Sequence, residues 1–220
     1  MLIVEETFLL LTKDNVAVDR IRPYRRHALV AALLADLAEA GVVDIGEGTD
    51  PKVSVVRAGT TGHPVLDASL PALDRLSGQK ISTLLASATL DPEPAVGRSL
   101  ARQGIVQEVP RRFRSPEYVT ANPAPEIALR QRLGEVVAGD RQASPAEATE
   151  LGILKALNVA YGVLGTARGD LDRRGLARRI VAVSQGVPAA QALQQMVDSV
   201  TASTTVTVTP AGAAGAAGAA

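Results

Sequence analysis

The residues best suited to bind a ligand lie in two arginine clusters. The first cluster holds Arg22, Arg25 and Arg26, with the aromatic residue Tyr24 among them. A guanidinium is planar and can donate two parallel hydrogen bonds to one phosphate, so such clusters favour phosphate ligands. We therefore expect an anionic headgroup site here. The alternative is a solvated arginine face in front of a buried helix.

The second cluster has a phenylalanine among its cations. Its members are Arg111, Arg112, Phe113 and Arg114. On a loop between two strands, the ring could insert into a membrane while the arginines meet lipid phosphates, each cation contributing about 1 kcal/mol near an anionic surface. The alternative is a charged hairpin tip whose phenylalanine folds back onto the protein body.

Other chemistry finds little support in the sequence. The chain has no cysteine, which excludes disulfides, thiolate metal sites and cysteine nucleophiles. His27 and His63 have no second ligand at metal-binding spacing, and no serine lies in a hydrolase elbow. We therefore expect a protein that is not an enzyme and needs no metal or cofactor.

Composition limits the classes of partner. The net charge is zero, which does not favour nucleic acid, and only five residues are aromatic. The N-terminus is acidic where a signal peptide would be basic. The longest apolar run, residues 28–35, is far shorter than the ~20 residues of a spanning helix. These features predict a cytoplasmic location, with peripheral attachment to the inner face of the plasma membrane as an option.

Two similar units place the arginine clusters. Residues 24–40 and 95–103 each read as a helix that ends at one glycine and turns directly into a short strand. Gly41 and Gly104 occupy the positions where a left-handed cap is needed. We expect strands at 42–45 and 53–57 to form one hairpin. The strand of the second unit should form a hairpin with residues 117–120, with the second cluster at or near the tip.

The remaining pattern predicts a mainly α fold with small β-hairpins. A proline follows Ser144 and Glu147 lies three residues after it, which is typical of a helix start. The other predicted helices are 2–12, 65–76, 80–89, 126–138, one from 145 through Leu164, 171–184, and one opening at Pro188. We place one domain at residues 1–203 and a low-complexity tail at 204–220.

A third arginine group follows the predicted helix that starts at Pro145. It comprises Arg168, Arg173, Arg174, Arg178 and Arg179. Asp170 and Asp172 lie among these arginines, so we expect a solvated helix face with ion pairs to the aspartates. Gly162, Gly165 and Gly169 do not follow a strand, which favours helix packing or termination over a phosphate loop.

Five segments, in this order, resemble the Golgi phosphoprotein 3 family in the form found in high-GC bacteria. They are residues 2–14, 33–45, 61–70, 100–106 and 126–133. The resemblance implies a mostly helical single domain with small hairpins. It also implies a peripheral membrane protein that binds phosphatidylinositol 4-phosphate in a basic pocket beside a hydrophobic hairpin tip and that sorts membrane-associated cargo.

Four positions depart from the family pattern. Ile21 stands where the family has a tryptophan, and Val30, Leu90 and Glu93 stand at or near family arginines. The expected partner is therefore an anionic membrane lipid, with a membrane-associated protein cargo or a second copy of the chain as further candidates.

A winged-helix protein is the competing interpretation. A helix, a glycine and a strand hairpin also describe a winged helix, whose basic wing can contact a nucleic-acid backbone or a protein. The zero net charge and the apolar long helix argue against a DNA-reading role.

Overall fold

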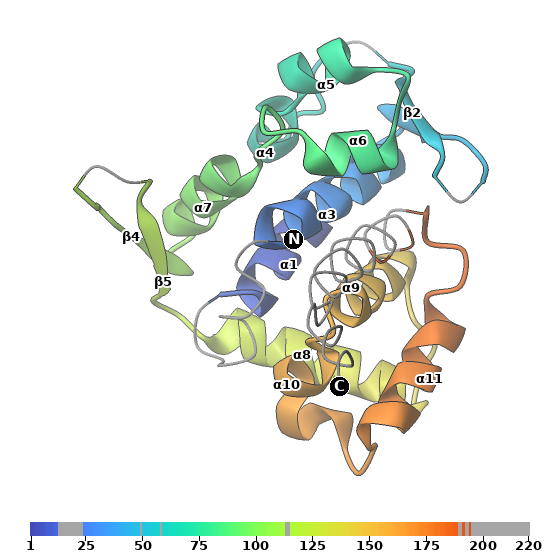
Figure 1. The fold of residues 1–220 in the computed structure, drawn as a ribbon. Coiled ribbons are helices and arrows are strands. Elements are labelled where there is room, and N and C mark those ends of the chain that lie inside the picture. Colours follow the sequence, from blue (N-terminus) through green and yellow to red (C-terminus); the bar gives the residue numbers. More distant parts are fainter. Residues whose placement is uncertain are drawn as a thin grey trace, which may run out of the picture.

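The computed structural model describes residues 1–12, 24–48, 50–57, 59–112 and 115–188, together with residues 191 and 194. Over these residues the fold is mainly α, as predicted, with two small antiparallel sheets (Figure 1). The helices are α1 (Ile3–Leu10), α3 (Arg25–Glu39), α4 (Pro64–Asp67), α5 (Leu70–Leu76), α6 (Ile81–Ala86), α7 (Glu93–Arg102), α8 (Ala124–Ala138), α9 (Pro145–Ala156), α10 (Ala160–Leu164), the 3₁₀ helix η2 (Gly165–Arg168) and α11 (Arg173–Val183).

Helix α3 lies at the centre of the molecule. It packs against α1, α6 and α9 (Figure 1), and its residues 28–34 have no exposed surface. A helix that is apolar all round is stable only where other elements cover it. The small alanine side chains in this run let the neighbouring helices approach closely, which explains an aliphatic core with very few rings.

The two helix–glycine–strand units have the predicted geometry. Gly41 and Gly104 have φ angles of 65° and 70°. In the first unit Val42 N–H donates to the Leu37 carbonyl, and in the second Ile105 N–H donates to the Leu100 carbonyl, at 2.9 and 3.0 Å. Bonds between residues five apart are typical of a Schellman cap, in which the chain turns sharply at a left-handed residue.

The first sheet has the order β1 (Val43–Ile45), β2 (Lys52–Val55) and β3 (Gln79–Lys80). Val43 pairs with Val55 and Ile45 with Val53, which confirms the predicted hairpin. The third strand was not predicted, because two exposed residues carry no strand pattern. The second sheet is the hairpin β4 (Val106–Val109) and β5 (Glu117–Thr120).

The predicted helix from 145 to 164 is wrong in one respect, because it breaks into α9 and α10. Asn158 has a φ of 56°, and the amides of Asn158 and Val159 donate back to the carbonyls of Lys155 and Leu154. Asparagine is the residue after glycine that best tolerates this left-handed position. The start was predicted correctly: Ser144 and Glu147 form a reciprocal capping box.

Two shorter helices also differ from the prediction. The segment 65–76 divides into α4 and α5, and Pro71 in the first turn of α5 has no N–H with which to continue α4. The segment 80–89 is helical only from Ile81 to Ala86. The helix expected after Pro188 and the tail at 204–220 lie almost wholly outside the described residues.

Candidate functional site

The β4–β5 hairpin projects away from the helices (Figure 1). Glu108 pairs with Tyr118, and Val109 pairs with Glu117 at the end nearest the tip. Since directly paired residues lie on the same face of a hairpin and successive residues alternate, Tyr118 and Glu108 share one face and Val109 and Val119 share the other.

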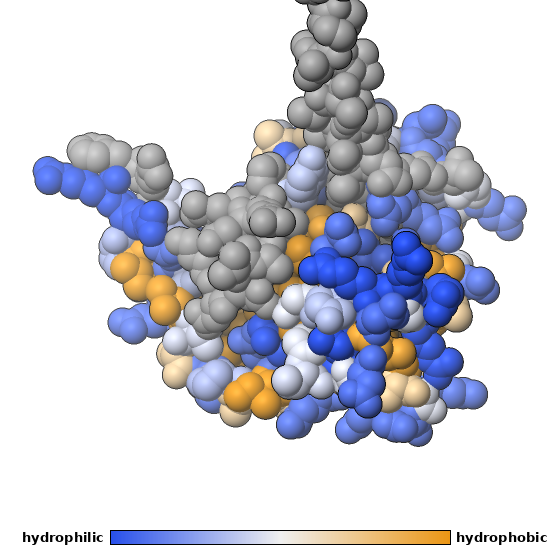
Figure 2. All heavy atoms as spheres, turned by 60° about the horizontal axis from the view of Figure 1, so that its bottom comes forward, coloured by the Kyte–Doolittle hydropathy of each residue, from blue (hydrophilic) through white to orange (hydrophobic). Residues whose placement is uncertain are grey.

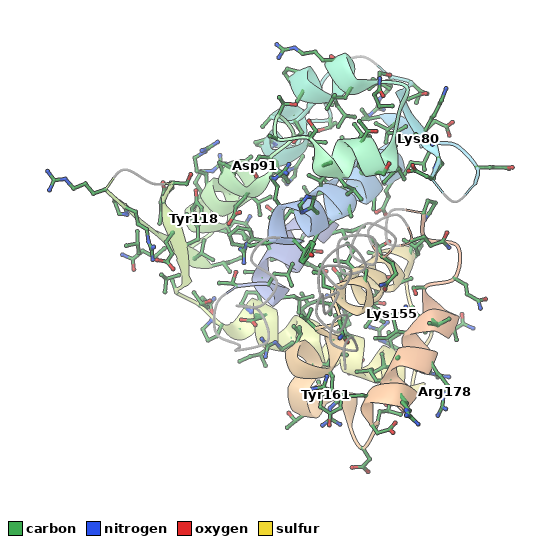
Figure 3. All side chains as sticks on the ribbon, viewed as in Figure 1. Lys80, Asp91, Tyr118, Lys155, Tyr161 and Arg178 are labelled. Atoms are coloured by element: carbon green, nitrogen blue, oxygen red, sulfur yellow. The ribbon has the colours of Figure 1, made fainter. Side chains whose placement is uncertain are left out.

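Tyr118 fixes the base of the hairpin against helix α7. Its side chain is 8% exposed and its ring meets Phe8 of α1 edge-on, with centroids 5.8 Å apart. The ring also occupies the space above Gly97, where an added methyl group would overlap it. Figure 3 shows Tyr118 on the side of the hairpin near α7. Glycine at position 97 therefore provides the notch that seats the hairpin.

The outer face of the hairpin carries exposed apolar side chains. Val109 is 38% exposed and Val119 is 48% exposed. In Figure 2 the hairpin forms the arm on the left, with hydrophilic spheres at its outer end and hydrophobic spheres nearer the body. The sequence analysis did not single out these valines. The adjacent Tyr118 and Val119 were the signal, since neighbouring apolar residues in a strand must point to opposite faces.

The described part of the tip is cationic. Arg111 and Arg112 are both exposed, and the guanidinium of Arg111 pairs with Glu117 across the hairpin. Exposed ion pairs of this kind contribute about 0–1 kcal/mol, so an anionic ligand could compete with Glu117 for the guanidinium. Phe113 and Arg114 lie outside the described residues, so the predicted insertion of Phe113 stays a prediction.

The first arginine cluster joins several helices. Arg25 stands 4.5 Å above the Phe8 ring, forms a 3.2 Å ion pair with Glu93 and donates to the Leu11 carbonyl. Arg26 donates to the carbonyls of Ala86 and Ser87 at the end of α6. Both guanidiniums therefore have partners within the protein.

Tyr24 and the nearby positions Val30 and Leu90 add no charge to this cluster. Tyr24 is half-buried, and its ring lies 6.2 Å from the His27 ring in a tilted arrangement. Val30 and Leu90 are buried. Arg22 lies outside the described residues. The structure does link this cluster to the hairpin, because the Phe8 ring contacts both Arg25 and Tyr118.

A charged network at the junction of α1, α8 and α9 was missed by the sequence analysis. Arg132 pairs with Glu6 at 2.6 Å and with Glu147 at 2.9 Å, and Arg141 pairs with Glu147. Burial would raise the pKa of Glu147, but hydrogen bonds from Arg141 and from Ser144 outweigh it and bring the pKa to about 2. Burial raises the pKa of Glu150 far above its usual range, and the nearby Glu6 raises it further.

The third arginine group differs from the expectation of ion pairs to aspartates. Arg168 and Arg173 stack on Tyr161 of α10, with 3.9 and 4.7 Å between guanidinium carbon and ring centroid. Asp172 instead caps α11 by accepting from the Gly175 amide at 2.7 Å. An N-cap satisfies a backbone donor that would otherwise lack a partner, so the Asp172 carboxylate serves as a helix cap.

Neither a metal-binding cluster nor a membrane-spanning helix is found among the described residues. No group of three or more histidine or acidic side chains there could hold a metal ion. Across the same residues, no helix has the length and apolarity needed to cross a membrane.

Comparison with known proteins supplies the family. A search of curated proteins finds no match. The family model described as Golgi phosphoprotein 3 (GPP34) matches residues 3–200, which includes the central helix, both helix–glycine–strand units and the α8–α11 helices. Since that match covers most of the chain, this protein belongs to the Golgi phosphoprotein 3 family.

Proposed function

We propose that the protein is a non-enzymatic, peripheral membrane protein that binds anionic lipid headgroups through the β4–β5 hairpin. The observation that carries the proposal is the composition of the hairpin: two exposed valines on its outer face and two exposed arginines at its tip. Membership of the Golgi phosphoprotein 3 family supports it, because resemblance to that family implies a peripheral membrane protein that binds phosphatidylinositol 4-phosphate.

The energies favour reversible attachment. Arg111 and Arg112 would each contribute at most about 1 kcal/mol near an anionic surface, and Arg111 less, because its guanidinium must first leave Glu117. Full burial of a valine side chain contributes about 1.5 kcal/mol, and the partly covered Val109 and Val119 would gain less. A total of a few kcal/mol gives binding that depends strongly on lipid charge and on salt.

We propose a general preference for anionic phosphates. Val30 and Leu90 are buried and carry no donor, and Glu93 is a carboxylate paired with Arg25. These residues stand at or near the positions of family arginines. Phosphatidylinositol 4-phosphate is therefore expected to bind through its charge, like other anionic lipids.

Vesicle flotation tests the proposal. The protein should float with phosphatidylcholine vesicles that contain phosphatidylglycerol or phosphatidylinositol 4-phosphate, and flotation should fall as salt rises. The double variant Arg111→Gln, Arg112→Gln should float several-fold less. Arg174→Gln with Arg178→Gln is the matched control, because these exposed arginines have the same charge and lie on α11.

Two results would overturn the proposal. One is flotation that the hairpin variant leaves unchanged. The other is salt-dependent binding to duplex DNA without binding to vesicles, which favours the winged-helix interpretation. We also expect the protein to lie in the cytoplasm on the inner face of the plasma membrane. Binding of a membrane-associated protein cargo and self-association are further expectations.

A further inference from the structure

A groove between α4, α7 and β4 holds charges that the proposed function does not use. Its volume is about 610 Å³. Arg98 and Arg102 of α7 and Glu108 of β4 supply its charge, and its other walls are the small residues Pro64, Ala68, Ala95 and Ala101. Glu108 lies on the hairpin face shared with Tyr118, opposite to the two exposed valines.

The two arginines are placed to hold one ligand together. They are four residues apart on α7, so their side chains leave the same face of the helix. Both are exposed, and neither has a hydrogen bond or an ion pair with any residue that the structure describes. In this respect they differ from Arg25 and Arg26, whose guanidiniums are engaged within the protein.

Glu108 restricts what the arginines can bind. Both Glu108 and Arg98 act on buried Tyr118: burial raises the pKa of that phenol, Glu108 raises it further and Arg98 lowers it. The opposite charges thus face one small region without an ion pair between them in the described chain. Glu108 makes a ligand with only anionic groups, such as a nucleic acid, less favourable than one that also carries a cation. A ligand with one phosphate and an adjacent cation satisfies all three side chains.

We propose that this groove binds a zwitterion in which a phosphate lies next to a primary ammonium group, with the phosphate on Arg98 and Arg102 and the N–H groups of the ammonium donating to Glu108. The planar forks of two guanidiniums suit the phosphate. The alanine walls leave room for the short link between the charges. The same chemistry occurs in free O-phosphoethanolamine and in the headgroup of phosphatidylethanolamine.

The first experiment titrates the full-length protein with O-phosphoethanolamine and follows backbone amide shifts by NMR. The amides of residues 95–102 and of Glu108 should move, and inorganic phosphate or ethanolamine should bind more weakly. The double variant Arg98→Gln, Arg102→Gln should weaken binding about tenfold, since it removes charge-assisted hydrogen bonds. The matched control is Arg174→Gln, Arg178→Gln, another exposed pair four residues apart, which should bind normally.

Glu108→Gln tests the zwitterion directly. It should weaken binding of O-phosphoethanolamine about threefold, the scale of one exposed ion pair, and should strengthen binding of inorganic phosphate. A role of Glu108 in folding alone would move both ligands in the same direction. The proposal is wrong if O-phosphoethanolamine does not bind, if binding ignores the Arg98 and Arg102 changes, or if inorganic phosphate binds equally well.

Vesicles distinguish the two sources of the ligand. Vesicles of phosphatidylcholine with phosphatidylethanolamine carry no net charge, so the arginines of the hairpin tip contribute little to binding there. If the lipid is the ligand, the protein floats with these vesicles and not with pure phosphatidylcholine vesicles, excess O-phosphoethanolamine releases it, and Arg111→Gln with Arg112→Gln has little effect. If binding occurs only to free O-phosphoethanolamine, the ligand is soluble. Either result is independent of flotation with anionic vesicles.

Discussion

The two helix–glycine–strand units begin alike and end in different surroundings. Both use a left-handed glycine and the same pair of backbone hydrogen bonds to turn a helix into a strand. The first hairpin is held by a third strand, with Gly78 N–H donating to the Val53 carbonyl at 2.7 Å. The second hairpin has no third strand in the described structure and projects from the body (Figure 1). One local motif thus builds either part of the scaffold or a projecting arm, depending on what covers its edge.

The largest expected effect lies in the first unit. Asp36 of α3 accepts hydrogen bonds from the amides of Ile3 and Val4, both at 2.8 Å, and so caps α1 from another helix. Asp36→Ala leaves two buried donors without a partner, which should cost about 3 kcal/mol of unfolding free energy. Urea unfolding measures this loss. A change below about 1 kcal/mol would mean that the cap contributes little to the scaffold.

A somewhat smaller effect is expected in the second unit. Gly97→Ala places a methyl group where the Tyr118 ring lies, and overpacking of this kind costs about 2 kcal/mol. It should also weaken vesicle binding, because the hairpin must shift. In a Tyr118→Ala background the same change should be neutral or stabilising, since alanine favours a helix more than glycine does. If the loss of stability persists in that background, the Tyr118 ring is not the reason why position 97 requires glycine.

The first unit should also give the protein a pH-dependent stability. Burial raises the pKa of Asp36 from 3.8 to about 7, against the lowering effect of the amides of Val4 and Ile3. An acid whose folded pKa is raised contributes its full stability below its unfolded pKa, and that stability is lost as pH rises through the folded pKa. Through Asp36, the unfolding free energy should therefore fall as the pH rises from about 4 to about 7 and change little above about pH 8.

Asp36→Asn should remove the part of that slope that Asp36 contributes, measured by urea unfolding at several pH values. Glu150→Gln is the control, because burial also raises the pKa of Glu150 and its slope has the same sign. Glu150→Gln should remove its own part of the pH dependence and leave that of Asp36 in place. An unchanged slope in Asp36→Asn would assign the titration to another group.

The smallest expected effects concern the two capping glycines, Gly41 and Gly104, whose changes should differ in vesicle binding but not in stability. An added methyl group meets nothing within 4 Å at Gly41 or at Gly104. Each change to alanine should therefore cost only the left-handed conformation, about 1 kcal/mol, and the two losses in thermal unfolding should agree. Vesicle binding should fall only for Gly104→Ala, because only that glycine leads into the projecting hairpin.

Local signals predicted much of the fold. The glycine caps, the hairpins and the start of α9 depend on residues a few positions apart, and the family resemblance rested on such segments. The Asp36 cap, the Gly97 notch and the Arg25–Glu93 pair join residues distant in sequence. No periodicity reveals those contacts. Asn158 was missed for another reason: an asparagine at a left-handed cap gives a weaker signal than a glycine.

The candidate site was predicted only in outline. The arginines at 111 and 112 do lie at the end of a hairpin. The exposed faces of Val109 and Val119 depended on strand register. That Arg98 and Arg102 have no ion pair with any described residue depended on which faces of α7 the rest of the fold covers. Both properties arise only in the assembled fold. Residue types alone therefore could not distinguish Arg25 and Arg26, which bind within the protein, from Arg98 and Arg102.

The contact of Tyr118 with Phe8 and Gly97 has an optical consequence. The protein contains no tryptophan and three tyrosines, which lie at the start of α3, in β5 and in α10. Tyrosine emission is therefore not masked by tryptophan, and each tyrosine reports on a different region. Fluorescence of a variant that keeps only Tyr118 would follow the seating of the hairpin without an attached dye, during unfolding or on contact with vesicles.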